Sequence, residues 1–156
     1  MKTKLLIALL AMITTYAVAQ EKKEKPEKVN VPEVVKKGFT SRFAAASDLK
    51  WGIEKPGEYE AEFTLNKAEM SALVDEKGNI LEVETEIRES ELPQAVKVTL
   101  SRDFADYKIG EVEKNEQKGI TSFEMEAKKG EAAYELAFDK NGKLLKKESI
   151  KEKDND

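Results

Sequence analysis

The sequence predicts an α+β fold: a tandem repeat of one helix plus about four antiparallel strands, with two helices packed on one face of an eight-strand antiparallel sheet. Three observations lead to this prediction. A segment with the apolar spacing of a helix occurs twice, and the second copy begins 61 residues after the first. Segments with the alternating pattern of strands also occur twice, 64 residues apart. The turn-forming sequences VDEKGN and FDKNGK lie at equivalent places in the two copies.

The helix prediction rests on the stretches VPEVVKKGFTSRF and LPQAVKVTLSRDF. Large apolar residues recur every four positions, as on one face of a helix: Val35, Phe39 and Phe43 in the first stretch, and Val96, Leu100 and Phe104 in the second. A proline near each start suits the first helical turn, where its missing N–H has no partner to lose. Glu33 and Gln94, each a few residues after a polar residue, are weak capping signals. We therefore expect helices over residues 31–46 and 91–105, with their apolar faces packed on the sheet.

The strand prediction rests on an alignment without gaps between the stretch that begins at Tyr59 and the one that begins at Phe123. Apolar and charged residues alternate in it, which is typical of an antiparallel sheet with one apolar face and one solvated face. In the first copy, Tyr59, Ala61, Phe63 and Leu65 alternate with Glu58, Glu60, Glu62 and Thr64. A further short strand is expected before each set, from the alternating residues Leu49, Trp51 and Ile53 in the first copy and Tyr107 and Ile109 in the second.

Turn sequences separate these strands in both copies. Asp75 and Asp139 each begin a D-x-x-G sequence between two strand-like runs. An aspartate at that position accepts a hydrogen bond from a backbone N–H ahead of it, and the glycine supplies a positive φ. Each sequence therefore predicts a short hairpin loop that ends in a bulge. The pairs Asn66-Lys67 and Lys129-Gly130 are the predicted turns one hairpin earlier.

Residues 1–19 are predicted to be a cleaved secretory signal peptide. Two early lysines, a short apolar run and the small residues Ala17-Val18-Ala19 are typical of such signals. A membrane anchor is the alternative, but the apolar run is too short for the roughly 30 Å of hydrocarbon in a bilayer. The cleavage site has no cysteine beside it that could carry a lipid. We therefore expect a protein that is periplasmic or secreted and is not inserted in the membrane after cleavage.

The rest of the chain divides by composition. Residues 20–29 predict a charged, disordered spacer, and residues 151–156 a flexible tail, because neither segment has enough apolar residues to pack. The two repeats are expected at residues 30–88 and 89–150. One copy of about 60 residues buries too little apolar surface to be comfortably stable alone, so stability is a first explanation for the duplication.

Several kinds of chemistry are excluded by the residue types present. Lysine and arginine number 27 against 31 aspartates and glutamates, and the two signs interleave, which does not indicate a nucleic-acid surface. The chain has no cysteine and no histidine, so it has no Ser–His–Asp triad, no Cys–His pair and no zinc site of the usual kind. Carboxylates could still act in acid–base chemistry. Because no pair stands out, we expect no catalytic residues and no enzymatic activity.

The order and doubling of these motifs resemble the PepSY-like proteins of the bacterial envelope, which are related in fold to the β-lactamase inhibitory protein. The resemblance rests on the signal peptide, the V/L-P-x-x-V-K helix starts at Val31 and Leu92, Trp51, and the D-x-x-G hairpins at Asp75 and Asp139. It covers about residues 30–150. It implies a tandem helix-plus-four-strand fold with a concave sheet, and a periplasmic binding or inhibitory module that acts on peptidases or in envelope signalling. The family has no catalytic residues to transfer to this chain.

The hairpin loops have a second interpretation as calcium sites. Asp139 and Asn141 stand where ligands 3 and 5 of an EF-hand loop would stand, but the first ligand position is occupied by an alanine. Asp75 begins the equivalent loop of the first copy. A plain turn is the simpler interpretation. Calcium binding through Asp75, Asp139 and Asn141 stays open as the alternative, and no other cofactor is expected.

Two further sets of residues are candidates for binding a partner. Acidic stripes on the polar face of the predicted strands are formed by Glu58, Glu60, Glu62, Glu82, Glu84 and Glu86. Such stripes are either a solvated face that resists aggregation or a docking surface for a basic partner or cation. Trp51 is either a core residue or an aromatic anchor at an interface.

These features predict an exported, non-enzymatic module that binds an envelope protein or a peptide, with inhibition or signalling as the outcome. The alternative function is a calcium-responsive periplasmic protein that uses carboxylate-rich loops.

Overall fold

The structure is a computed structural model and describes residues 29–150 of the 156-residue chain. Its elements, in chain order, are α1 (Glu33–Arg42), β1 (Ser47–Lys55), β2 (Glu58–Leu65), β3 (Ala68–Asp75), β4 (Ile80–Ile87), the 3₁₀ turn η1 (Glu89–Glu91), α2 (Gln94–Asp103), β5 (Lys108–Gln117), β6 (Ile120–Lys129), β7 (Ala132–Asp139) and β8 (Leu144–Ile150). The predicted signal peptide, most of the spacer and the tail lie outside the described residues.

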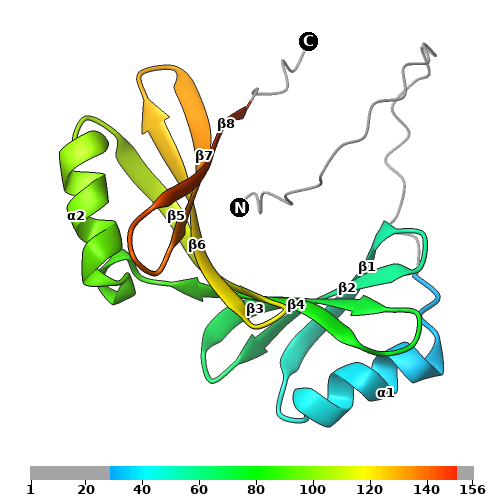
Figure 1. Ribbon diagram of the computed structural model, residues 1–156. Helices are drawn as coiled ribbons and strands as arrows, with labels where there is room; N and C mark the ends of the chain where they lie inside the picture. The colour runs from blue at the N-terminus through cyan, green and yellow to red at the C-terminus, as the bar shows by residue number, and fades with distance from the viewer. Residues whose placement is uncertain (1–28, 151–156) are drawn as a thin grey trace, which may run out of the picture.

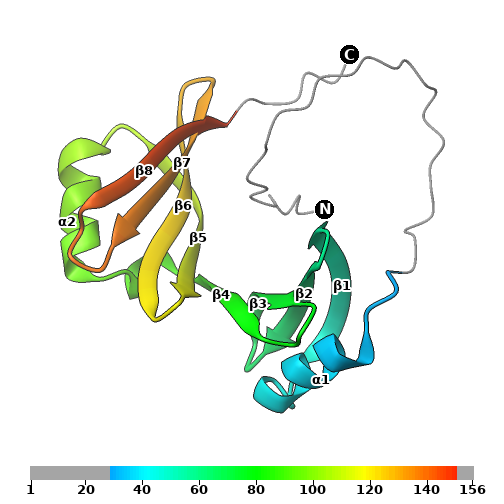
Figure 2. The same ribbon diagram turned by 45° about the vertical axis from the view of Figure 1, so that its right-hand side comes forward.

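The eight strands form one antiparallel sheet in the order of the chain, β1 to β8. The two halves join where residues 82–87 of β4 pair with residues 112–117 of β5. The sheet is curved, and both helices lie on its convex side (Figures 1 and 2). The predicted α+β fold, with two helices on one face of an eight-strand sheet, is therefore confirmed. The structure adds that the two half-sheets are continuous.

Each helix packs on its own half of the sheet and forms a separate hydrophobic core. Under α1, the buried residues include Val35, Phe39, Phe43, Ala61, Phe63, Ala72, Val74 and Val83. Under α2, they include Val96, Leu100, Phe104, Val112, Phe123, Met125, Leu136 and Phe138. The apolar helix faces predicted from the four-residue spacing are thus the faces that pack on the sheet.

Both helices are shorter than predicted. They begin at Glu33 and Gln94 and end before Phe43 and Phe104. The prolines occupy the N-cap positions with ψ near 145°, and neither N-cap makes a side-chain hydrogen bond, so the predicted caps are wrong. The two phenylalanines leave the helical conformation (ψ of 50° and 24°) although their N–H groups still bond to the preceding turn. Both phenylalanines are buried against the sheet just after the helices end. The four-residue apolar spacing therefore continues past the last helical residue, and this made the predicted helices too long.

The strand predicted from Tyr107 and Ile109 begins after Tyr107 and continues to Gln117 as β5. Its second half was missed because it does not alternate between apolar and polar residues. Lys114 and Glu116 lie on the convex side, opposite Thr85 and Val83 of β4, and pair with each other at 3.1 Å. The two helix cores reach this joint at Val83 of β4 and Val112 of β5 but do not include Lys114 and Glu116. At those two positions solvent replaces the apolar partner that normally produces the strand pattern.

The D-x-x-G hairpins form as predicted. The Oδ1 atom of Asp75 accepts hydrogen bonds from the N–H groups of Lys77 (2.9 Å) and Asn79 (2.8 Å). Asp139 does the same in the second copy, at 2.8 and 2.9 Å. A shift of pairing in the β3–β4 and β7–β8 ladders marks the predicted bulge next to each loop.

The glycine of each hairpin lies directly against a helix. Gly78 has a φ of +84°, and a Cβ there would lie 2.6 Å from the carbonyl oxygen of Val34 in α1. A Cβ on Gly38 of α1 would lie only 2.0 Å from the carbonyl oxygen of Gly78. In the second copy, the Thr99 hydroxyl of α2 donates a buried hydrogen bond of 2.8 Å to the carbonyl oxygen of Gly142. The repeated turn sequence therefore attaches the β3–β4 and β7–β8 hairpins to their helices.

Replacement of Thr99 by valine is expected to destabilise the protein by about 1–2 kcal/mol, because the shape is kept but the carbonyl oxygen of Gly142 loses a buried donor. Chemical denaturation measures this change. The matched control is Thr40→Val in α1, where the hydroxyl is exposed and bonds only to the Lys36 carbonyl oxygen of its own helix. The control should change stability by less than about 0.5 kcal/mol. Equal effects at the two positions would contradict a docking role for Thr99.

Candidate functional site

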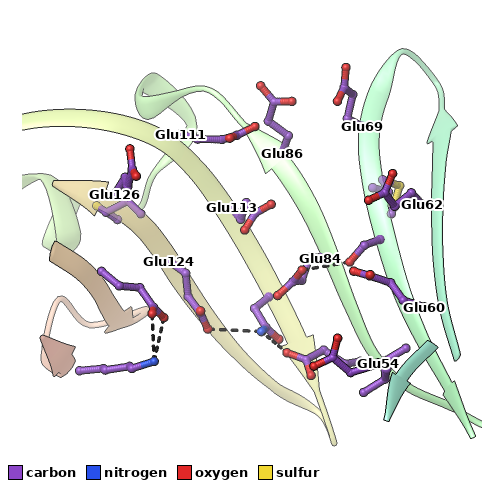
Figure 3. Close-up of a pocket in the computed structure, with 18 of the residues that line it drawn as sticks. Glu54, Glu60, Glu62, Glu69, Glu84, Glu86, Glu111, Glu113, Glu124 and Glu126 are labelled. Atoms are coloured by element: carbon purple, nitrogen blue, oxygen red, sulfur yellow. Dashed lines mark hydrogen bonds and ion pairs between the residues drawn. The ribbon is translucent and has the colours of Figure 1, made fainter. Parts of the chain in front are cut away.

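The concave face of the sheet, on the side away from both helices, has a groove with a volume of about 360 Å³. Twelve of the side chains that line it are glutamates, and one is a lysine (Figure 3). The glutamates are Glu54, Glu60, Glu62, Glu69, Glu82, Glu84, Glu86, Glu111, Glu113, Glu124, Glu126 and Glu135, and the lysine is Lys146. Both repeats contribute, so the groove extends across the joint between them.

Strand alternation places these carboxylates on one face. In β2, Ala61 and Phe63 point into the core under α1, and Glu60 and Glu62 therefore point to the opposite face. In β5, Val112 enters the core under α2, and its neighbours Glu111 and Glu113 line the groove. The burial that holds the helices on the convex side thus also fixes which residues face the groove.

The pairing of the central strands places three of the glutamates side by side. Glu113 of β5 lies directly opposite Glu86 of β4 on one side and opposite Glu124 of β6 on the other. Like charges directly opposite in a sheet are destabilising. No lysine or arginine interrupts this row, which we call the central glutamate row.

Neutral donors satisfy several of the surrounding carboxylates. The Ser71 hydroxyl donates to Glu84 at 2.9 Å, and the Gln117 amide donates to Glu82 at 2.7 Å. The amide of Asn115, which is buried, bridges Glu82 and Glu124. Amides and hydroxyls hold these side chains in place without neutralising them, so the groove keeps its negative charge.

The single lysine lies at the end of the groove formed by the second repeat. Lys146 of β8 donates to both carboxylate oxygens of Glu135, at 3.0 Å each, and pairs with Glu148 at 2.9 Å. Glu135 is buried, with 8% of its surface exposed. The one cation of the groove is therefore already engaged by two carboxylates, and the central row has none.

Burial and mutual repulsion raise the pKa values of three groove carboxyls. Burial, followed by the charges of Glu84, Glu111, Glu124 and Glu86, raises the pKa of Glu113 to about 7. Burial is also the main cause of the raised pKa values of Glu84 and Glu124. Half-buried carboxylates of this kind have lost part of their hydration, so an approaching cation interacts with them more strongly than with fully exposed ones.

The structure brings five of the predicted binding residues together and separates two. The five that line the groove are Glu60, Glu62, Glu82, Glu84 and Glu86. Glu58 belongs to the same strand as Glu60 but lies outside the groove lining and pairs with Lys55 at 3.0 Å. Trp51 is on the convex side, where its ring meets Phe39 edge-on with centroids 5.4 Å apart. It packs against the core and does not reach the groove.

The residues predicted as calcium ligands lie in separate hairpins. The carboxylates of Asp75 and Asp139 are occupied with the N–H groups of their own loops, and Asn141 contributes such an N–H. Within residues 29–150, no group of three or more acidic, histidine or cysteine side chains is placed to hold a metal ion. The geometry of these loops is that of turns.

The glutamates of the second repeat were not singled out from the sequence. A usable signal was present for two of them, because the offset of 64 residues places Glu124 on Glu60 and Glu126 on Glu62. Glu111 and Glu113 lacked such a signal, since they lie in β5 beyond the predicted strand. Only the pairing of β5 with β4 and β6 shows that Glu111 and Glu113 lie between the groove glutamates of the first repeat and those of β6.

The comparisons with known proteins agree with this architecture. A family described as "Putative beta-lactamase-inhibitor-like, PepSY-like" matches the chain twice, over residues 17–82 and 57–146. No curated protein matches. No helix of residues 29–150 has the length and apolar character needed to cross a membrane.

Several solved structures share the fold. One, described as a putative periplasmic protein from Bacteroides eggerthii, is 17% identical, with a TM-score of 0.75, and the match covers 81% of this chain and 94% of that one. A BLIP-like protein from Bacteroides fragilis is 21% identical, with a TM-score of 0.71 and coverage of 83% and 94%. A DUF2874 family protein from Bacteroides ovatus is 20% identical, with a TM-score of 0.72 and coverage of 78% and 89%.

At these identities the solved structures establish the fold alone. The family match is broader evidence, because its two segments together cover most of the chain and overlap both repeats. The chain therefore belongs to the PepSY-like, β-lactamase-inhibitor-like family.

Proposed function

We propose that this protein is an exported, non-enzymatic binding module that holds a lysine- or arginine-rich segment of another envelope protein, or a basic peptide, in the concave groove. The observation that carries the proposal is the composition of the groove, with twelve glutamates and one lysine on a face of the sheet that neither helix covers. Charge complementarity on this scale selects a basic ligand and accelerates its association.

The contrast with the rest of the surface supports this proposal. Outside the groove, several acidic side chains lie beside cations: Glu33 pairs with Lys36 at 2.8 Å, and Asp106 with Lys129 at 3.4 Å. In the central glutamate row, carboxylates face carboxylates. Because like charges directly opposite lower the stability of a sheet, a row of this kind is accounted for best by a cation that arrives from outside.

The fold relatives support a binding role and an envelope location. The family description refers to β-lactamase inhibitors, and one solved relative in fold is called BLIP-like. An inhibitor of this kind acts by binding another protein. A second solved relative is described as a putative periplasmic protein, in line with the predicted signal peptide.

A titration of the protein with a fluorescent decapeptide of alternating lysine and glycine tests the proposal. We expect saturable binding at pH 8 that weakens steeply between 50 and 300 mM salt, because exposed and half-exposed charges are screened over about 10 Å at 0.1 M salt. A triple variant, Glu84→Gln, Glu86→Gln and Glu124→Gln, is expected to lose roughly tenfold or more in affinity.

The matched control removes three glutamates outside the groove: Glu33→Gln, Glu89→Gln and Glu131→Gln. It changes the net charge by the same amount and should change affinity less than about threefold, since distant surface charges are largely screened. Equal losses in the two triple variants would show a general charge effect and contradict a site in the groove. If calcium binds in place of the peptide, the calcium-responsive alternative replaces the proposed function.

A further inference from the structure

We propose that the central glutamate row, Glu86, Glu113 and Glu124, couples the binding of a basic segment to the release of a proton, so that the groove holds its ligand more tightly above neutral pH than below it. This inference rests on the proposed function and adds a form of regulation to the same site. It follows from the position of Glu113 relative to the charges around it.

Glu113 is surrounded by carboxylates from each strand beside it. β4 contributes Glu84 and Glu86, β6 contributes Glu124 and Glu126, and β5 itself contributes Glu111. The cations paired with groove carboxylates lie away from Glu113: Lys128 pairs with Glu126 at 3.7 Å, and Lys146 is engaged by Glu135 and Glu148. Ionisation of Glu113 therefore adds a negative charge to a site that already repels it.

Glu113 also lacks the donors that Glu84 and Glu124 have. Glu84 accepts from Ser71, and Glu124 accepts from Asn115 and Ser122. In the part of the chain that the structure describes, no side chain donates to Glu113 or pairs with it. Burial first, and the surrounding carboxylates second, raise the pKa of Glu113 to about 7. No donor within the described sheet offsets these two effects.

A bound lysine or arginine would supply the missing countercharge. With a cation in the groove, the ionised form of Glu113 is favoured, and the carboxyl group releases its O–H proton to the solvent while the ligand's ammonium or guanidinium keeps its own protons. By linkage, a site that releases a proton on binding binds more tightly as the pH rises through the range in which that proton titrates. The coupling therefore acts between about pH 6 and pH 8.

Isothermal titration of the protein with the lysine–glycine decapeptide, in two buffers with different ionisation enthalpies, measures the proton directly. At pH 7 we expect about half a proton to be released per peptide bound, because a group with a pKa near 7 is half protonated there. We expect the association constant at pH 8 to be about fivefold larger than at pH 6.

Glu113→Gln is expected to abolish the proton release and most of the pH dependence, with an affinity at pH 8 close to that of the unaltered protein at pH 6. The matched variant is Glu62→Gln, which also removes a groove carboxylate. Glu62 lies opposite Lys50 and Ser71 and has no glutamate as a direct cross-strand partner. It should weaken binding at both pH values and retain the proton release.

A second measurement separates failure of the coupling from failure of the proposed function. Carbon-13 NMR of the side-chain carboxyl groups reports the titration of Glu113 in the protein without ligand. A Glu113 carboxyl that titrates below pH 5, or peptide binding of equal strength at pH 6 and pH 8, overturns the coupling and leaves the binding function intact. Absence of peptide binding at both pH values contradicts the proposed function, and the coupling fails with it.

Discussion

Replacement of Gly38 by alanine is expected to destabilise the protein by about 2–4 kcal/mol, and to lower its melting temperature by roughly 10 °C. A Gly→Ala change in the middle of a helix normally stabilises a protein, because glycine there is destabilising by about 0.5–1 kcal/mol relative to alanine. The expected effect at Gly38 has the opposite sign. The reason is the hairpin of the first repeat: the new Cβ would lie 2.0 Å from the backbone carbonyl oxygen of Gly78, so the helix or the hairpin must move.

Gly52→Ala is the matched control, and thermal unfolding followed by circular dichroism measures both variants. The nearest atoms to a Cβ on Gly52 of β1 belong to the Glu60 side chain, at 3.7 Å and beyond, which is an ordinary contact. The control should therefore be neutral or slightly stabilising. A gain in stability from Gly38→Ala would show that the hairpin does not rest on α1 as the structure describes.

Replacement of Glu113 by glutamine is expected to stabilise the protein at pH 8 and to leave its stability unchanged at pH 4. The raised pKa, about 7 against an ordinary 4.5, means that the folded protein holds this proton more tightly than the unfolded chain does. The unfolded chain releases the proton first, so the free energy of unfolding decreases as the pH rises from about 4.5 towards 7. Glutamine carries no charge at any pH and avoids this loss. Because solvent reaches this half-buried carboxyl, we expect a gain of about 1–2 kcal/mol at pH 8.

Urea denaturation at pH 4 and pH 8 measures this effect. The matched control is Glu116→Gln on the same strand, which removes an exposed ion pair with Lys114 on the convex side. Such pairs contribute less than about 1 kcal/mol, so the control should be neutral or slightly destabilising at pH 8. A Glu113→Gln variant that is less stable than the unaltered protein at pH 8 would show that the central row is neutralised in the protein alone.

The duplication has a consequence for the groove as well as for stability. Each repeat has its own hydrophobic core, and the two are joined through β4 and β5. The central glutamate row crosses that joint, with Glu86 from the first repeat and Glu113 and Glu124 from the second. A single repeat would present only part of the acidic face. The proposed binding surface therefore requires both copies in one continuous sheet.

The sequence by itself determined the repeated architecture, because periodicity reports which side of each element is buried. The four-residue spacing of Val35, Phe39 and Phe43 identified the packed face of α1, and the alternation around Ala61 and Phe63 identified the faces of β2. The same alternation placed Glu60 and Glu62 on the polar side, and they line the groove. These inferences succeeded because each depends only on neighbours within one element.

Only the tertiary structure decided which carboxylates meet. The row of Glu86, Glu113 and Glu124 is created by the pairing of β5 with β4 and β6. No local pattern marks the pairing of β5 with β4, because charged residues, Lys114 and Glu116, take convex positions of β5 there. The docking of Gly78 on Gly38 likewise brings together residues 40 positions apart in the chain. Pairing between strands and contact between distant backbone segments depend on the whole fold. The alternation of buried and exposed residues, in contrast, can be read within a single strand or helix. The sequence therefore specified the acidic face, and the curvature and pairing of the sheet made it a groove with a crowded centre.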